Sequence, residues 1–184
     1  WKLKIENSVV LDVGSSTGGF VDCLLQNGAK KVYAVDTAYG ELAWKLRNDP
    51  RVVVMDRTNI LFPDTWKVGP VPKDVFSFQV DIVTIDAGWT RLELILPIVK
   101  KFLKENGIII ALLKPHYEAN KQSLRDKSLK RDLVKGVLPL ELAEQVKNEV
   151  LLKIENLKLK IITVMESPIL GGGGNQEYLL SLKL

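Results

Sequence analysis

The chain has 184 residues, of which 46% are hydrophobic and 26% charged, and its formal net charge is +4. This composition is typical of a globular protein with a sizeable core and argues against a disordered or fibrous chain; we expect residues 1–184 to form one domain. The single cysteine, Cys23, excludes an intrachain disulfide and favours a reducing, cytoplasmic compartment. No apolar run reaches membrane-spanning length and no signal peptide is visible, so we expect no membrane insertion. The chain opens on Trp1 rather than methionine, as a fragment of a longer protein would.

The stretch VVLDVGSSTGGF, residues 9–20, reads as a buried strand, a glycine-rich loop and the start of a helix. Glycine permits backbone angles that other residues resist and allows a ligand to approach the backbone closely. The stretch lacks both the G-x-G-x-x-G dinucleotide fingerprint and the lysine of a Walker loop. We therefore expect a loop that cradles part of a nucleotide-like ligand, although a tight turn in an unrelated α/β domain would look similar.

Asp12 lies at the end of this first strand, just ahead of the loop. A carboxylate there repels phosphate and suits the ammonium group of an amino-acid moiety, which is the arrangement expected for S-adenosylmethionine (SAM). The predicted cofactor-binding residues in this stretch are Asp12, Gly14, Ser15, Ser16, Thr17, Gly18, Gly19 and Phe20.

Hydrophobic periodicity, and the glycine and proline residues that interrupt it, predict the remaining elements. Helices are predicted over residues 19–26, 39–46 and 90–104 and over most of 121–156, with a kink at Pro97 and a break near Gly136 and Pro139. Strands are predicted over residues 9–13, 31–36, 51–55, 80–86, 107–114, 158–167 and 177–184. Cys23 is predicted to lie on the apolar face of the first helix, as a small core residue.

Strands that alternate with helices and end in a hairpin predict an α/β fold. We expect a Rossmann-like fold with a mostly parallel seven-stranded sheet, one antiparallel strand and helices on both faces. In such sheets, ligands bind beyond the carboxyl ends of the strands.

Four polar residues follow predicted strands at this edge, namely Asp36, Asp56, Asp86 and Lys114. Asp36 stands about twenty residues after the glycine loop, where a carboxylate can hydrogen-bond two ribose hydroxyls; a helix N-cap is the alternative and is compatible with it. Asp56 and its polar neighbours are predicted to meet an adenine edge, and Asp86 is predicted as a further cofactor contact. A lysine such as Lys114 is unusual at the end of so apolar a strand and is a candidate for chemistry.

The ordered motifs LDVGSSTGGFVDCLLQNGAKKVYAVD, LAWKLRNDPRV, RTNI, LLKPHYE and SPILGGGGNQEYLL cover nearly the whole chain. Together they resemble the FtsJ-like RNA 2′-O-methyltransferases, and most closely their TlyA, or hemolysin-A-like, ribosomal RNA branch. The resemblance implies a SAM-dependent enzyme that methylates ribosomal RNA, alone or in a ribosomal subunit. The amino-terminal S4 domain of that branch is not present in this chain.

The resemblance also implies a Lys-Asp-Lys-Glu catalytic set, in which Asp86, Lys114 and Glu177 match the last three members. A ribose hydroxyl is a poor nucleophile at neutral pH, so a group that stabilises its developing negative charge is needed. We expect Lys114 to do this, oriented by the two carboxylates. Only WKLKIENS precedes the first strand, so no residue of this chain matches the first lysine of the set.

Substrate contact is predicted for a basic segment, residues 121–135, in which six cations face two acids. The residues assigned to RNA phosphates are Lys121, Arg125, Lys127, Lys130 and Arg131, although a solvated helix face is the common explanation of such a run. Trp89 departs from the family pattern. Two interpretations are equally compatible with the sequence: Trp89 stacks on a base, or it packs under the next helix. His116, the only histidine, replaces a glutamine common in the family, and without a cluster of other ligands it indicates no metal.

Other function classes stay open at this point. A non-catalytic RNA- or ribosome-binding module that retains the SAM fold is the first alternative, favoured by the absent first lysine. A small-molecule methyltransferase is compatible with the same fold. A membrane-active hemolysin, suggested by the name of the branch, ranks last, because no amphipathic apolar stripe accompanies the basic segment.

Overall fold

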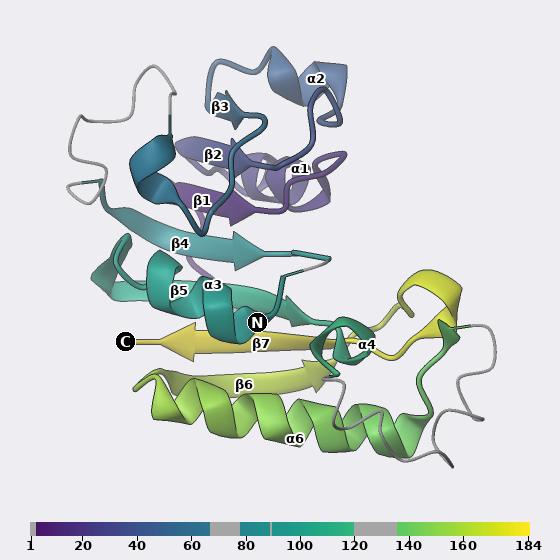
Figure 1. Cartoon of the computed structure of the whole chain (residues 1–184). Coiled ribbons are helices and arrows are strands. Elements are labelled where there is room, and N and C mark those ends of the chain that lie inside the picture. Colours follow the sequence, from purple (N-terminus) through teal and green to yellow (C-terminus); the bar gives the residue numbers. More distant parts are fainter. Residues whose placement is uncertain (1–2, 67–77, 89, 120–135) are drawn as a thin grey trace.

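The computed structural model describes residues 3–66, 78–88, 90–119 and 136–184. They form a seven-stranded sheet in the order β3-β2-β1-β4-β5-β7-β6 (Figure 1). All neighbouring strands pair in parallel except β7, which is antiparallel to both β5 and β6. The predicted fold, a mostly parallel sheet with one antiparallel strand, is confirmed.

The strands are β1 (Val9–Val13), β2 (Lys31–Val35), β3 (Val52–Met55), β4 (Val80–Ile85), β5 (Leu103–Leu113), β6 (Lys160–Glu166) and β7 (Tyr178–Lys183). The helices are α1 (Gly19–Gln26), α2 (Trp44–Arg47), α3 (Leu92–Val99), α4 (Pro115–Glu118) and α6 (Leu140–Asn156), with 3₁₀ turns at Pro63–Thr65 and Gly172–Gly174. Each predicted strand is present, because continuous apolar runs such as that of β1 are suited to a sheet that is covered on both faces.

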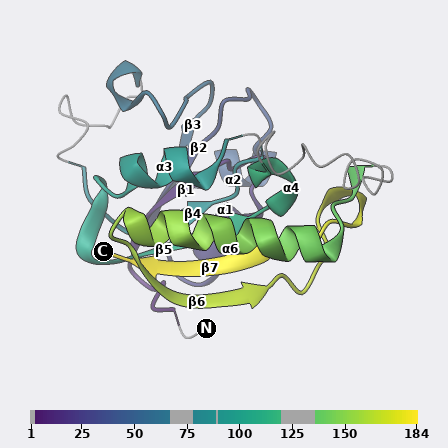
Figure 2. The same ribbon diagram turned by 60° about the horizontal axis from the view of Figure 1, so that its bottom comes forward.

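The helices pack on both faces of the sheet, and each face has its own hydrophobic core. On one face α3 and α6 cover β4, β5 and β7 (Figure 2), and Phe102, Leu96 and Ile154 are fully buried there. On the other face α1 covers β1 and β2, where Val21 and Leu24 pack against Val10. The carboxyl ends of the parallel strands lie along one edge, which places the residues that follow them together.

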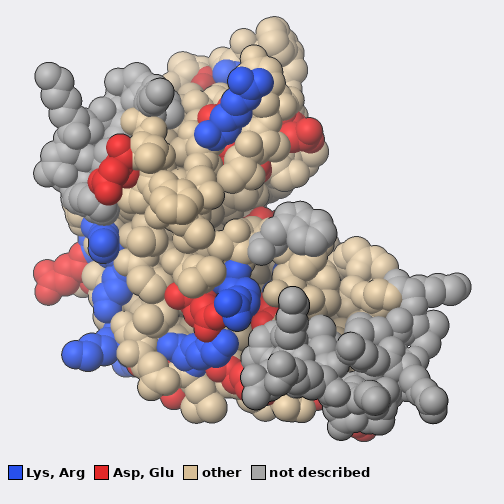
Figure 3. All heavy atoms as spheres, viewed as in Figure 1, with Lys and Arg blue, Asp and Glu red and all other residues tan. Residues whose placement is uncertain are grey.

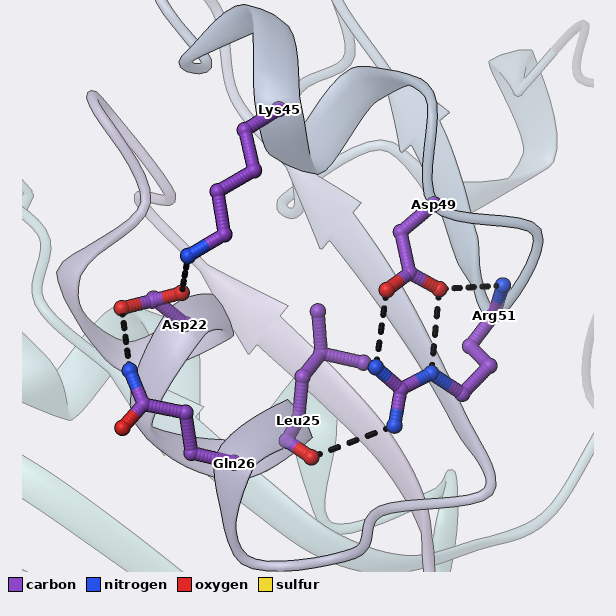
Figure 4. Close-up of polar contacts among 6 residues, drawn as sticks. All are labelled: Asp22, Leu25, Gln26, Lys45, Asp49 and Arg51. Atoms are coloured by element: carbon purple, nitrogen blue, oxygen red, sulfur yellow. Dashed lines mark hydrogen bonds and ion pairs between the residues drawn. The ribbon is translucent and has the colours of Figure 1, made fainter.

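Surface polar contacts attach α2 and the start of β3 to α1 (Figure 4). The ammonium of Lys45 on α2 lies 3.0 Å from the Asp22 carboxylate on α1. Arg51 is paired with Asp49 at 2.8 Å and donates to the carbonyl of Leu25 at 3.1 Å. Exposed pairs of this kind contribute little energy, so the apolar face of α1 is what holds this side of the molecule together.

Two predicted helices are wrong in extent. The helix predicted over residues 39–46 is reduced to α2, and the one predicted over residues 90–104 ends at Val99. Pro97 lies in the last turn of α3, where its missing N–H removes one of the last helical bonds. β5 begins at Leu103, ahead of the strand predicted from residue 107, and its pairing with β4 shifts register between Val80 and Ile82.

Candidate active site

The glycine loop packs against the segment that follows β4. Gly14 has φ +81°, and its N–H and that of Ser15 donate to the Val35 carbonyl at 2.9 and 3.2 Å. A Cβ on Gly14 would lie only 2.4 Å from the backbone oxygen of Asp86. The glycine is therefore required twice, by its backbone angle and by the approach of the β4 segment.

Asp12 is almost completely buried beneath this loop, at 1% exposure. It stands opposite Thr84 in the β1–β4 register, and its Oδ1 accepts a hydrogen bond from the Thr84 hydroxyl. Its Oδ2 has no hydrogen-bond partner among the described residues. Burial raises the pKa of Asp12 to about 6. The carboxylate is thus built to accept a cationic or hydrogen-bonding group that the described residues do not supply.

A cleft of about 360 Å³ opens where β1, β2, β4 and β5 end. We call it the central cleft. Its polar lining comes from Ser16, Asp36, Thr37, Thr58, Asn59, Asp86, Thr90 and Lys114, and its apolar lining includes Val35, Ile60 and Ile95.

Asp36 follows β2 at the central cleft, as predicted, and its two oxygens accept backbone N–H groups. Oδ2 accepts from Ser16 at 2.7 Å and Oδ1 from Ala38 at 2.8 Å. The helix N-cap considered for this residue is absent, because α2 begins only at Trp44. Asp36 instead joins the glycine loop to the β2 edge, and it lines the cleft.

Asp56 is not among the residues that line the central cleft. Its carboxylate pairs with Arg47 at 2.7 Å and accepts the Gly40 N–H at 3.3 Å. The Arg47 guanidinium beside it lowers the pKa of Asp56 below its ordinary value. Its neighbours Thr58 and Asn59 reach the cleft in its place. Asp56 thus lies outside the lining of the central cleft, and its adenine contact stays a prediction.

Asp86 and Lys114 meet at the end of β4 and β5. The Lys114 Nζ lies 2.5 Å from Asp86 Oδ1, and the side chains are 17% and 34% exposed respectively. Both residues line the central cleft. The pair is therefore partly sheltered from water and remains open to a ligand, which strengthens its electrostatic effect on that ligand.

Glu177 lies directly before β7, beside this pair, and is only 6% exposed. Burial raises its pKa; the positive charge of Lys114 opposes the rise and the negative charge of Asp86 adds to it. A Cβ on Gly171 would lie 2.0 Å from Glu177 Oε1, so the glycine run packs directly against the carboxylate. The three residues predicted as catalytic are thus brought together from β4, β5 and β7.

The glycine run itself is held by Asn175, which is buried. Its Oδ1 accepts the Leu138 N–H at 2.8 Å, and its Nδ2 donates to the carbonyls of Gly136 and Gly172 at 3.2 and 2.9 Å. These bonds fix the segment that covers Glu177 to the chain entering α6.

A second cleft of about 440 Å³ lies on the α1 side of the glycine loop. Its lining contains Asp12, Gly14, Ser15, Ser16, Thr17, Gly19, Phe20, Cys23, Asp86, Leu112, Ser167, Pro168, Ile169 and Leu179. Cys23 is exposed here, so its prediction as a core residue is wrong. The buried face of α1 is made by Val21, Leu24 and Leu25, and position 23 falls outside it. Gly18, which lines neither cleft, has φ +104° and packs against Leu46.

Some of the predicted site residues lie outside the described residues, namely Trp89, Lys121, Arg125, Lys127, Lys130 and Arg131. His116 is described: it is half-buried against Tyr117, and burial and the charge of Lys114 lower its pKa. Within residues 3–66, 78–88, 90–119 and 136–184, no group of three or more His, Cys, Asp or Glu side chains could hold a metal ion. No helix of the same ranges is long and apolar enough to cross a membrane.

Three residues of the site were missed by sequence reasoning: Thr84, Asn175 and Glu118. Thr84 is a polar residue between Val83 and Ile85 near the end of β4, and it stands opposite Asp12, so the pattern carried a usable signal. For Asn175, the only sequence signal was its position directly after four glycines. The carboxylate of Glu118 accepts the Leu92 N–H, and nothing in the sequence alone indicated this contact.

Comparison with known proteins places this arrangement in a family. The model of the FtsJ-like methyltransferases matches residues 1–184. The chain is 40% identical over 98% of its length to the "Putative rRNA methyltransferase YqxC" of Bacillus subtilis, and 36% identical over 94% to the 16S/23S rRNA (cytidine-2′-O)-methyltransferase TlyA of Mycobacterium tuberculosis. It spans 59% of the length of each of these relatives.

The solved structure of a similar protein shares the fold of this chain. The crystal structure of "a putative hemolysin from Lactococcus lactis" superposes with a TM-score of 0.82 at 36% identity, covering 98% of this chain and 79% of that one. At 15% identity, the fibrillarin pre-rRNA processing protein of Methanococcus jannaschii shares the fold with a TM-score of 0.68. The chain belongs to the FtsJ-like methyltransferase family.

Proposed function

We propose that this chain is the catalytic domain of an enzyme that transfers a methyl group from SAM to a ribose 2′-hydroxyl of ribosomal RNA. The observation that carries the proposal is the Lys114–Asp86 pair, 2.5 Å apart in the central cleft, with the buried Glu177 beside it. Membership of the FtsJ-like methyltransferase family and the methyltransferase names of its relatives support the same reaction class.

The cofactor side of the proposal is supported by the fit of the residues around the glycine loop. The orphaned Oδ2 of buried Asp12 suits the ammonium of the methionine moiety. Asp36 and Asn59 offer hydrogen-bonding groups to a ribose and an adenine in the central cleft. When bound, SAM supplies a sulfonium-activated methyl group.

On the substrate side, Lys114 donates a hydrogen bond to the ribose oxygen and stabilises the negative charge that develops as this oxygen attacks. Asp86 holds the ammonium in place through the ion pair. Glu177, whose pKa burial raises, would accept the proton that the 2′-hydroxyl loses as the new bond forms. Orientation and electrostatic stabilisation are therefore the main contributions of these side chains.

The substrate is inferred from chemistry and from relatives rather than from an RNA contact. TlyA of Mycobacterium tuberculosis is named for 2′-O-methylation of cytidine in 16S and 23S rRNA. We assign the phosphates of the RNA to Lys121, Arg125, Lys127, Lys130 and Arg131, which would make binding weaken with salt.

The test uses the natural full-length protein with methyl-labelled SAM and unmodified ribosomal RNA or subunits. We expect label that survives alkaline hydrolysis within a dinucleotide, since a methylated 2′-oxygen cannot attack the adjacent phosphate. Lys114→Ala should lower transfer by about a hundredfold or more. Lys45→Ala is the matched control, because this exposed lysine pairs with Asp22 on α1 and is not part of the central cleft.

The outcomes separate the competing functions. No transfer to any RNA, together with measurable SAM binding, would contradict the proposal and favour the non-catalytic RNA-binding module. Label on a base rather than on the ribose would contradict the assigned target atom. Equal activity of the Lys114→Ala variant would remove the lysine from the reaction.

A further inference from the structure

A single buried carboxylate, that of Glu118, connects the chain segments that follow the two strands of the Asp86–Lys114 pair. It belongs to α4, whose last residues are anchored on Lys114: the N–H groups of Tyr117 and Glu118 donate to the Lys114 carbonyl at 2.9 and 3.2 Å. Its Oε1 accepts the Leu92 N–H at 2.7 Å, and both partners are buried. Leu92 is the first residue of α3, which the chain enters after Asp86.

The hydrogen bond from the Leu92 N–H to Glu118 caps the N-terminus of α3 from outside the helix. The N-cap residue of α3, Arg91, makes no side-chain capping bond. The first N–H groups of a helix have no partner within the helix, and a carboxylate stabilises this end. Glu118 therefore fixes where α3 begins from the neighbouring β5 segment.

The loop between Asp86 and α3 is part of the central cleft, which Ala87, Gly88 and Thr90 line. Tyr117 of α4 packs close to this loop: a Cβ on Gly88 would lie 3.8 Å from its ring. The loop is thus bounded by Asp86 at one end and by the Glu118 bond at the other. Without that bond, the start of α3 is no longer tied to the segment that follows Lys114.

The charges around Glu118 come from α3 and α6. Burial raises the pKa of Glu118 to about 7; its bond to Leu92 and the positive charges of Lys153 and Arg91 oppose the rise, while Glu93 adds to it. Glu93 pairs with Lys153 at 2.7 Å and with Arg91 at 2.9 Å. Basic and acidic side chains gather over α3 and α6 on the face shown in Figure 3. Glu93 is partly exposed, which makes it a suitable control for Glu118.

We infer that Glu118 is a positioning residue, which keeps the Asp86 carboxylate and the Lys114 ammonium together by joining the α4 turn to the start of α3. Its effect on methyl transfer rests on the function proposed above. Its effect on the local structure does not. The bond needs an acceptor oxygen at the end of a side chain as long as that of glutamate. We therefore expect glutamine to keep the bond to Leu92 and the shorter aspartate to lose it.

The test compares Glu118→Gln, Glu118→Met and Glu118→Asp in the full-length protein, with Glu93→Gln as control. Amide hydrogen exchange around Leu92 measures the bond directly. We expect exchange to rise by about tenfold or more in the Met and Asp variants, and to stay within about threefold of wild type in the two Gln variants.

Single-turnover methyl transfer at saturating SAM and RNA then measures the consequence. We expect the Met and Asp variants to lose about tenfold or more in rate, while Glu118→Gln and Glu93→Gln stay within about threefold of wild type. If the Met variant does not fold, the Asp variant, which keeps the charge, decides. Wild-type exchange at Leu92 in the Asp variant, or an unchanged rate despite faster exchange, would overturn the inference. A wild-type protein without transfer would contradict the proposed function, and the exchange data would still test the bond.

Discussion

Replacement of Asp12 by asparagine should make the ligand-free protein more stable and at the same time weaken its binding of SAM. The two effects have one cause, which is the unpaired Oδ2 of a carboxylate that is 1% exposed. An asparagine carbonyl can still accept the hydrogen bond from Thr84, so the change removes the charge and keeps the packing.

The magnitude follows from the pKa of Asp12, which burial raises from 3.8 to about 6. Because the folded protein then holds the proton more tightly than the unfolded chain, this group costs stability as the pH rises from about 4 to about 6. The cost reaches about 3 kcal/mol and is constant at higher pH. Asp12→Asn should therefore be more stable than wild type by up to about 3 kcal/mol at pH 8 and nearly equal to it at pH 4.

Urea unfolding at pH 4 and pH 8 measures the stability change, and calorimetric titration with SAM measures binding. Loss of a charge-assisted bond to the ammonium should weaken SAM binding by about tenfold or more. Asp81→Asn is the control of opposite sign: bonds from Lys104 and from the Val9 N–H outweigh burial and lower the pKa of Asp81, so its replacement should cost stability at pH 8. An Asp12→Asn protein that is less stable at pH 8, or that binds SAM as tightly as wild type, would refute the reasoning.

Two glycine substitutions test how closely the glycine loop approaches Asp86 and how closely the glycine run approaches Glu177. Gly14→Ala should destabilise the fold by about 2 kcal/mol or more and lower SAM affinity, because the new Cβ meets the Asp86 carbonyl at a positive φ; thermal unfolding and titration with SAM measure both, and wild-type values would contradict the predicted clash. Gly171→Ala should lower methyl transfer by about tenfold with the fold retained, because its Cβ would displace the Glu177 carboxylate; Gly172→Ala, with nothing within 4 Å of its Cβ, should keep wild-type activity, and equal rates for the two variants would exclude the displacement.

Much of the sheet was predictable because its strands are short apolar runs that end in polar residues. The run ahead of Gly14 and the run ahead of Asp86 each had a buried strand as their straightforward interpretation, and both strands are present. The boundary between α3 and β5 was not predictable, since the apolar period of a helix continued past Pro97 into a segment that pairs with β4. The local sequence pattern does not contain the pairing of β5 with β4, which limits the helix.

The candidate site divides in the same way. The residue types that follow the strands, such as Asp36 and Lys114, were visible in the sequence because parallel strands bring their carboxyl ends to one edge. The ion pair of Asp56 with Arg47 was not visible, since the two residues belong to different elements. The exposed position of Cys23 likewise follows from which face of α1 meets the sheet.

The sequence by itself determined the order of the strands and helices, the glycine loop and the acidic and basic residues at the strand ends, because these depend on local backbone preference and hydrophobic period. Only the tertiary structure decided which charges meet. Lys114 faces Asp86, Glu177 is enclosed by Gly171, and Asp12 keeps an unpaired oxygen. Such distances depend on the register and packing of strands far apart in the chain, and burial then sets the pKa of each group.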